Sequence, residues 1–160
     1  MRTATMTDVE TVYRRDHERL WRSLVAYAGD PEIATEAEAE AFTQVLARGA
    51  EVTDPAAWVW RAAFRIANGL LAVKRSGATP LPTSGDGATL PASEVVIDHS
   101  LAEFLDLLQT LSNQQRMVVV LRYAGGLKPV EIADVLDTTA GAVRVQLHRA
   151  HDQLRERIDA

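Results

Sequence analysis

Side chains able to bond nucleic-acid bases gather near the C-terminal end of the sequence, in residues 140–158. Apolar residues recur there at the spacing of one helix face, at Val143, Leu147, Ala150 and Leu154. The opposite face presents Arg144, Val145, His148, His151 and Arg155, with Gln146 and Arg149 on its flank. Arginine bonds guanine edges bidentately, glutamine does the same to adenine, and valine can meet a thymine methyl group. The pattern predicts a helix that reads DNA, and a solvated charged face on a helical bundle is the alternative interpretation.

The segments before this helix have the layout of a helix-turn-helix. Pro129 suits the first turn of a short helix over 129–136, and Asp137-Thr138-Thr139 then turns the chain into the long last helix. Two helices joined by such a tight turn place the second one in the major groove of DNA. Thr138 and Thr139, together with the amides that begin the last helix, are suited to bind phosphate.

Two further helices are expected before the helix-turn-helix. The segment 94–110 is amphipathic through apolar residues at helical spacing. Ser112 and Gln115 then have the form of a capping box, in which each side chain satisfies a backbone amide of the other residue. This box predicts a helix over 113–124, which Gly125-Gly126 ends.

The N-terminal half contains three helical patterns with short joints. We expect helices over 8–28, 31–48 and 55–75. Asp54 can cap the third helix and Pro55 fits its first turn. Three helices with such short connections predict a compact bundle.

A segment rich in Pro, Gly, Ser and Thr divides the chain. Residues 76–91 read SGATPLPTSGDGATLP and have no apolar period, which is the composition of a flexible linker. Strand-like alternation is missing on both sides of this segment. The sequence therefore predicts an all-α fold of two small helical domains: a three-helix bundle over 1–75, a flexible linker over 76–96 and a helix-turn-helix domain over 97–160.

The composition argues against several classes of protein. The chain has no cysteine, which excludes disulfide frameworks, zinc knuckles and thiol nucleophiles. The four histidines lack metal-ligand spacing and no glycine-rich phosphate loop is present, so we expect no enzyme, no metal and no cofactor. No apolar stretch is long enough to span a bilayer, and acidic Asp8 and Glu10 stand where a signal peptide would be cationic. We expect a soluble cytoplasmic protein.

The net charge of −5 is unusual for a DNA-binding chain, but the charges are unevenly distributed. Residues 76–110 contain five acidic and no basic side chains, whereas residues 111–160 contain seven basic and six acidic ones. The basic side chains of the last segment are concentrated on its final helix, as Arg144, Arg149, Arg155 and Arg157. A DNA-reading surface is expected at that place.

The stretch from Leu111 to Ile158 resembles region 4 of extracytoplasmic-function sigma factors. The family's pattern reads L-x-x-x-Q-R-x-V-x-x-L-R-Y, then G-L, E-I-A and a helix with G-x-V-[KR]-x-x-L-x-R-A, and this chain matches it in order and spacing. The resemblance implies that the last helix reads the promoter element near minus 35, through Arg144, Gln146, His148 and Arg149. Val145 stands where a small polar residue is common, which changes the expected base preference.

The N-terminal unit is similar to region 2 of the same family, with a weaker match. The stretch WVWRAAFRIANGLLAVKR resembles the helix that binds the promoter element near minus 10, which implies DNA contacts for Trp58, Trp60, Arg61, Arg65, Lys74 and Arg75. Aromatic rings stack on the bases of a melted strand while arginines attract its phosphates. Burial in the core is the alternative for the rings: we favour it for Phe64, and for Trp60 both interpretations stay open.

The helix that docks onto the polymerase usually reads D-L-x-Q-E-x-F in this family. This chain has Glu36-Ala37-Glu38-Ala39-Glu40-Ala41-Phe42, so the resemblance implies polymerase contacts for Glu36, Glu40 and Phe42. Ala39 removes a side-chain amide, and one lost interfacial hydrogen bond costs about 1 kcal/mol. Gly69 replaces a family aspartate and the arginine run beyond it is reduced to Lys74-Arg75, so we expect weaker polymerase binding or weaker promoter melting.

The resemblance implies core RNA polymerase, promoter DNA and an anti-sigma factor as partners, and no membrane. Two other functions fit the same residues. The chain could be a sigma-like helix-turn-helix regulator that binds DNA but does not support initiation. It could also be a protein-interaction module whose acidic N-terminal unit binds another regulator.

Overall fold

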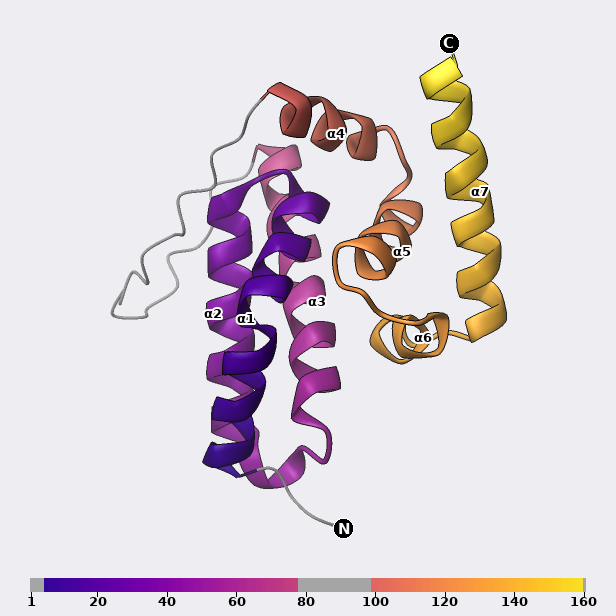
Figure 1. The fold of residues 1–160 in the computed structure, drawn as a ribbon. Coiled ribbons are helices and arrows are strands. Elements are labelled where there is room, and N and C mark those ends of the chain that lie inside the picture. Colours follow the sequence, from indigo (N-terminus) through magenta and orange to yellow (C-terminus); the bar gives the residue numbers. More distant parts are fainter. Residues whose placement is uncertain (1–4, 78–98, 160) are drawn as a thin grey trace.

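Seven α-helices and one 3-10 turn make up residues 5–77 and 99–159, the parts of the chain that the computed structural model describes (Figure 1). Helices α1 (Met6–Ala28), α2 (Pro31–Arg48) and α3 (Pro55–Ser76) form the N-terminal bundle, with the 3-10 turn η1 (Gly49–Glu51) between α2 and α3. The second unit consists of α4 (His99–Gln109), α5 (Asn113–Tyr123), α6 (Pro129–Leu136) and α7 (Ala140–Asp159). The predicted all-α fold is confirmed.

Local capping explains where several helices begin. The Asp54 carboxylate accepts a hydrogen bond from the amide of Ala57 at 3.2 Å, and Pro55 occupies the first turn of α3. Ser112 and Gln115 form the predicted capping box at the start of α5, with hydrogen bonds of 3.2 and 3.1 Å. Both predicted caps are confirmed.

The predicted linker lies almost entirely outside the described residues. Only its first two residues are described: Ser76 ends α3, and Gly77 follows with a φ of 71°. This left-handed conformation is common just after a helix and suits glycine, which has no Cβ to clash. Residues 94–98, which the sequence assigns to the helix that became α4, also lie outside the described residues.

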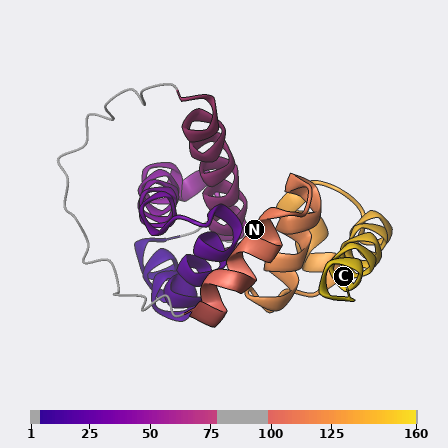
Figure 2. The ribbon, with the colours of Figure 1, turned by 90° about the horizontal axis from the view of Figure 1, so that it is seen from above.

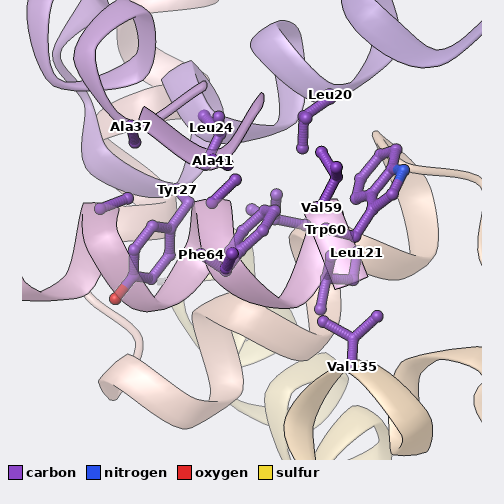
Figure 3. Packing of buried hydrophobic residues seen from close by; sticks show 14 of the residues in the cluster. Leu20, Leu24, Tyr27, Ala37, Ala41, Val59, Trp60, Phe64, Leu121 and Val135 are labelled. Atoms are coloured by element: carbon purple, nitrogen blue, oxygen red, sulfur yellow. The ribbon is translucent and has the colours of Figure 1, made fainter. Parts of the chain in front are cut away.

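The two units pack directly against each other. Helix α5 contacts α1 and helix α6 contacts α3, while α7 packs on α5 and α6. Figures 1 and 2 show α5 and α6 between the N-terminal bundle and α7. Within the described residues, one hydrophobic cluster joins both units. Figure 3 shows Trp60 and Phe64 of α3 in this cluster, with Leu20 on one side and Leu121 and Val135 on the other.

Burial of apolar side chains accounts for this packing. Leu20, Leu24, Leu121 and Ile132 are completely shielded from solvent. Burying one such side chain contributes about 1.5–3 kcal/mol. None of the helices in residues 5–77 and 99–159 is both long enough and apolar enough to cross a membrane.

Candidate nucleic-acid interface

Helix α7 has one face in the core and the other in solvent. Val143 and Ala150 are buried, and Leu147 and Leu154 are half-buried against the same cluster, as the apolar period predicted. The other face presents the predicted DNA-contacting side chains: Arg144, Val145, His148 and Arg149 are exposed and Gln146 is half-buried. Because α7 lies on the side of the second unit away from the bundle (Figure 2), this basic face points to the exterior of the molecule.

The turn before α7 places two predicted phosphate ligands at the helix start. Thr138 and Thr139 are both exposed. The Thr139 hydroxyl accepts a hydrogen bond from the amide of Ala142 at 3.1 Å, so it caps α7. The other amides of the first helical turn carry partial positive charge and have no partner within the helix, which suits them to phosphate.

The side chains predicted to contact a melted strand are dispersed along α3. Arg65, Lys74 and Arg75 are exposed, although Lys74 bonds the Asp30 carboxylate at 2.6 Å and Arg75 donates to Gln109 Oε1 at 3.3 Å. Trp58 is half-buried, with the Arg48 guanidinium 5.9 Å from its ring centre. These residues stay predicted DNA contacts.

Trp60 and Arg61 face the second unit. The Trp60 side chain is only 3% exposed and belongs to the core cluster, which agrees with the core interpretation left open above. The Arg61 guanidinium donates a hydrogen bond to the backbone carbonyl of Asp134 in α6. The Trp60 ring is therefore buried in the described arrangement, whereas Arg61 is half-buried and keeps part of its side chain in solvent.

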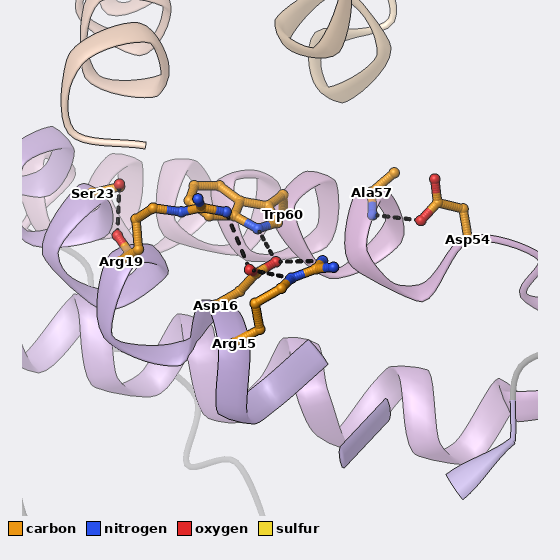
Figure 4. Close-up of polar contacts among 7 residues, drawn as sticks. All are labelled: Arg15, Asp16, Arg19, Ser23, Asp54, Ala57 and Trp60. Carbon is orange, nitrogen blue, oxygen red and sulfur yellow. Dashed lines mark hydrogen bonds and ion pairs between the residues drawn. The ribbon is translucent and has the colours of Figure 1, made fainter. Parts of the chain in front are cut away.

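A buried carboxylate organises the region around Trp60, as Figure 4 shows. Asp16 of α1 is 1% exposed and accepts a hydrogen bond from Trp60 Nε1 at 3.1 Å. It also accepts hydrogen bonds from Arg15 at 2.9 and 3.2 Å and from Arg19 at 3.1 Å. Burial alone would raise the pKa of Asp16, but the hydrogen bonds from Arg15 and Trp60 and the charges of Arg15 and Arg19 lower it below its usual value. The carboxylate is thus held ionised, and Arg19 lies over the Trp60 ring at 5.3 Å.

The predicted polymerase-binding residues on α2 differ in exposure. Glu36 and Glu40 are exposed, whereas Phe42 is buried and packs edge-on against Tyr13 at 5.0 Å between ring centres. Glu38, on the same helix, is 3% exposed and pairs with His17 Nδ1. Burial raises the pKa of Glu38 to about 7, against the opposing effects of the charge and hydrogen bond of His17.

Two polar clusters escaped the sequence interpretation. Asp16 follows Val9 and Val12 on the apolar face of α1, and a charged residue at such a position indicates a buried ion pair. Arg116 of α5 is 1% exposed and donates from Nε to the backbone carbonyl of Tyr27 at 2.8 Å. This second contact joins the two units, and nothing in the local sequence around either residue predicts their pairing.

Comparisons with known proteins give a consistent assignment. Residues 101–154 match the family model described as sigma-70, region 4. The chain is 33% identical over 102 residues to the ECF RNA polymerase sigma factor SigD of Mycobacterium tuberculosis H37Rv, which covers 62% of this chain and 48% of SigD. It is 25% identical over 162 residues to the RNA polymerase sigma-E factor of Streptomyces antibioticus, which covers 99% of this chain and 89% of that protein.

The fold is also similar to a solved structure. The sigma factor RpoE in complex with the anti-sigma factor NepR from Bartonella quintana matches with a TM-score of 0.69 and 16% identity, over 97% of this chain and 99% of that chain. At this identity the likeness shows the fold. The chain spans about half the length of SigD, 48% of it. Residues 101–154 thus match the sigma-70 region 4 family, and the chain is similar in sequence to extracytoplasmic-function RNA polymerase sigma factors.

Proposed function

We propose that this chain binds core RNA polymerase and directs it to promoters, with α7 reading the minus-35 element and α3 contacting the minus-10 element. The observation that carries the proposal is the exposed face of α7 in a region 4 helix-turn-helix. Arg144, Val145 and Arg149 are presented there, while buried Val143 and Ala150 fix the rotation of the helix. The proposed role is recognition, with no chemical step.

The exposed face of α7 has the chemistry that groove reading requires. Two arginines can bond guanine edges, Gln146 can bond adenine, and Val145 is 49% exposed and can meet a thymine methyl group. Thr138 and the first amides of α7 would contact phosphates and so set the register of the helix on the duplex. The opposite, apolar face of the helix is occupied by the core, so only this face can enter the groove.

The polymerase-binding surface of the proposal lies on α2. Glu32, Glu36 and Glu40 are exposed at four-residue spacing and therefore lie along one side of the helix. Leu46, six residues beyond Glu40, is 50% exposed and lies about 120° around the helix from it. The acidic row fits a partner surface with basic groups, and Leu46 offers an apolar contact near the end of α2. Phe42 is buried, so its proposed role is to pack inside the bundle and hold α2 in position.

Promoter-dependent transcription tests the proposal directly. Purified chain and core RNA polymerase would be incubated with a library of genomic promoter fragments, and run-off transcripts would be sequenced. Transcripts that require the chain, together with its copurification with core, are the expected result. DNA binding without core binding or transcripts would instead identify a helix-turn-helix regulator. An anti-sigma protein is a further proposed partner, supported by the pairing of RpoE with NepR.

Removal of one α7 arginine is expected to weaken promoter binding. Arg144→Ala should reduce affinity for a promoter duplex recovered in the transcription assay by roughly 10- to 100-fold, because a bidentate arginine contributes about 1–3 kcal/mol of base discrimination. Arg157→Ala removes the same charge from the end of the same helix, where the side chain is exposed, and should change affinity little. Fluorescence anisotropy measures both. Equal losses would indicate diffuse electrostatic attraction and would contradict groove reading by Arg144.

A further inference from the structure

Tyr123 and His151 form a hydrogen-bonded pair on the surface of the second unit. Tyr123 is the last residue of α5, and His151 lies in the middle of α7. The Tyr123 hydroxyl is 2.7 Å from His151 Nε2, and the two ring centres are 5.6 Å apart. Both side chains are exposed, Tyr123 by 61%. An aromatic ring with this exposure contributes little to the core, so packing of the described fold does not account for the pair.

His151 continues the row of side chains on the proposed groove-reading face. Exposed residues at spacings of four, three and four lie along this side of α7: Arg144, His148, His151 and Arg155. At 1.5 Å per residue, His151 lies about 10 Å beyond Arg144 along the helix axis. The major groove is about 12 Å wide, and a recognition helix contacts base edges with its first residues. If Arg144 contacts a base, His151 therefore reaches the edge of the groove, where the phosphates are.

The hydrogen bond with Tyr123 determines which donor His151 offers to a phosphate. A neutral imidazole has one N–H group, and its other nitrogen is an acceptor. When the Tyr123 hydroxyl donates to Nε2, the imidazole proton is on Nδ1, which can donate to a phosphate oxygen. The contact with the Tyr123 ring also orients the imidazole, so less side-chain freedom is lost on binding.

The charges near His151 are compatible with an anion. Arg155 is exposed one turn further along the same row and adds a positive charge. The Asp152 carboxylate lies 3.5 Å from His148 Nε2, so it is directed towards the start of the helix. At that start, Thr138 and the first amides of α7 are proposed phosphate ligands. A contact at His151 would give α7 a second phosphate ligand beyond its base-reading residues.

We propose that His151 binds a backbone phosphate of duplex DNA at the edge of the groove that α7 enters, and that Tyr123 is the positioning residue that orients it. This inference rests on the proposed function. A phosphate contact carries no base information, so it fixes the register of the helix without adding sequence preference. Contacts at Thr138 and His151 hold α7 at two points, with Arg144 between them over the base edges.

Loss of this contact should weaken binding to all sequences equally. His151→Ala should lower affinity for a promoter duplex and for a scrambled duplex by the same factor, about three- to tenfold. His151→Gln keeps a side-chain N–H donor and should recover part of the loss. Tyr123→Phe keeps the ring and removes the hydroxyl. Its smaller loss should disappear in a His151→Ala background, because Tyr123 acts through His151. Tyr13→Phe removes a hydroxyl from the N-terminal bundle and should leave affinity unchanged.

Fluorescence anisotropy measures these affinities, and circular dichroism checks that each variant is folded. Duplexes with one neutral methylphosphonate, moved along both strands, then locate the phosphate. Wild type should lose affinity at a position beside the promoter element where His151→Ala loses nothing further.

Three results would overturn the inference. A folded His151→Ala chain that binds both duplexes as tightly as wild type, while Arg144→Ala weakens promoter binding, overturns the phosphate contact and leaves the proposed function standing. An undiminished effect of Tyr123→Phe in the His151→Ala background overturns the positioning role. Absence of duplex binding by wild type overturns both this inference and the proposed function.

Discussion

Replacement of Asp16 by alanine is expected to lower the free energy of unfolding by about 3 kcal/mol, because removal of one partner from a buried charged network costs roughly 3–5 kcal/mol and the exposed arginines here recover some solvation. The buried Trp60 N–H would lose its acceptor, and Arg15 and Arg19 would lose their shared carboxylate. Urea unfolding followed by circular dichroism measures the loss.

Two companion variants separate charge from packing at this site. Asp16→Asn keeps the size of the side chain and one oxygen acceptor but removes the charge. Its free energy of unfolding should therefore lie between those of wild type and Asp16→Ala. Glu18→Ala removes a carboxylate from the same helix at an exposed position and should change stability by less than about 0.5 kcal/mol. A loss for Asp16→Ala no greater than that for Glu18→Ala would show that the buried network contributes nothing.

The second large effect concerns pH and Glu38. Its pKa is raised from 4.5 to about 7 in the folded chain, so between these values the folded state holds a proton that the unfolded state has released. The contribution of Glu38 to the free energy of unfolding is therefore fully present below pH 4.5 and is lost as pH rises towards 7. The free energy falls by at most about 1.4 kcal/mol per pH unit in this range. Above pH 7 the contribution is constant.

Glu38→Gln is expected to remove this pH dependence. The variant should gain stability relative to wild type as pH is raised from 5 to 7.5, because wild type must ionise a carboxyl whose Oε2 atom is buried and has no hydrogen-bond partner. Glu36 is an exposed neighbour on α2, so the free energy of unfolding of Glu36→Gln should change with pH in the same way as that of wild type across the same range. Urea titrations at four pH values give the change in free energy of unfolding per pH unit. An identical change for Glu38→Gln and wild type would show that Glu38 does not cause the pH dependence.

Helix positions could be predicted from the sequence because their signals are local. Pro31 and Gly49 bracket α2, Pro129 and Asp137 bracket α6, and the predicted bounds of both helices agree with the structure. Backbone caps act within about four residues, so one short stretch of sequence contains all the partners involved. The exposed face of α7 was predictable for the same reason, since one apolar period determines which side is buried.

The packing of the two units could not be predicted in this way. Tyr27 and Arg116 are 89 positions apart, and the residues around each one are compatible with many other partners. Trp60 illustrates the consequence for the candidate site. Its aromatic ring suits both base stacking and a core, and only the positions of Asp16 and Gly125 in space show that it is buried here. Phe42 on α2 is similar, because its ring suits both a protein interface and the core, and the structure shows it buried.

The shared core also limits how freely the two units can be exchanged between related chains. A second unit transplanted onto another bundle would place Arg116 against a helix end other than that of Tyr27, and Gly125 against a side chain other than Trp60. The Arg116 guanidinium would then either be buried without a hydrogen-bond acceptor or remain exposed to water because the two units pack less closely. In a hybrid of this protein, Tyr27, Trp60 and the residues that contact them should therefore be transferred together. The linker sequence suggests that the chain can be divided there, but the hydrophobic core extends across both units.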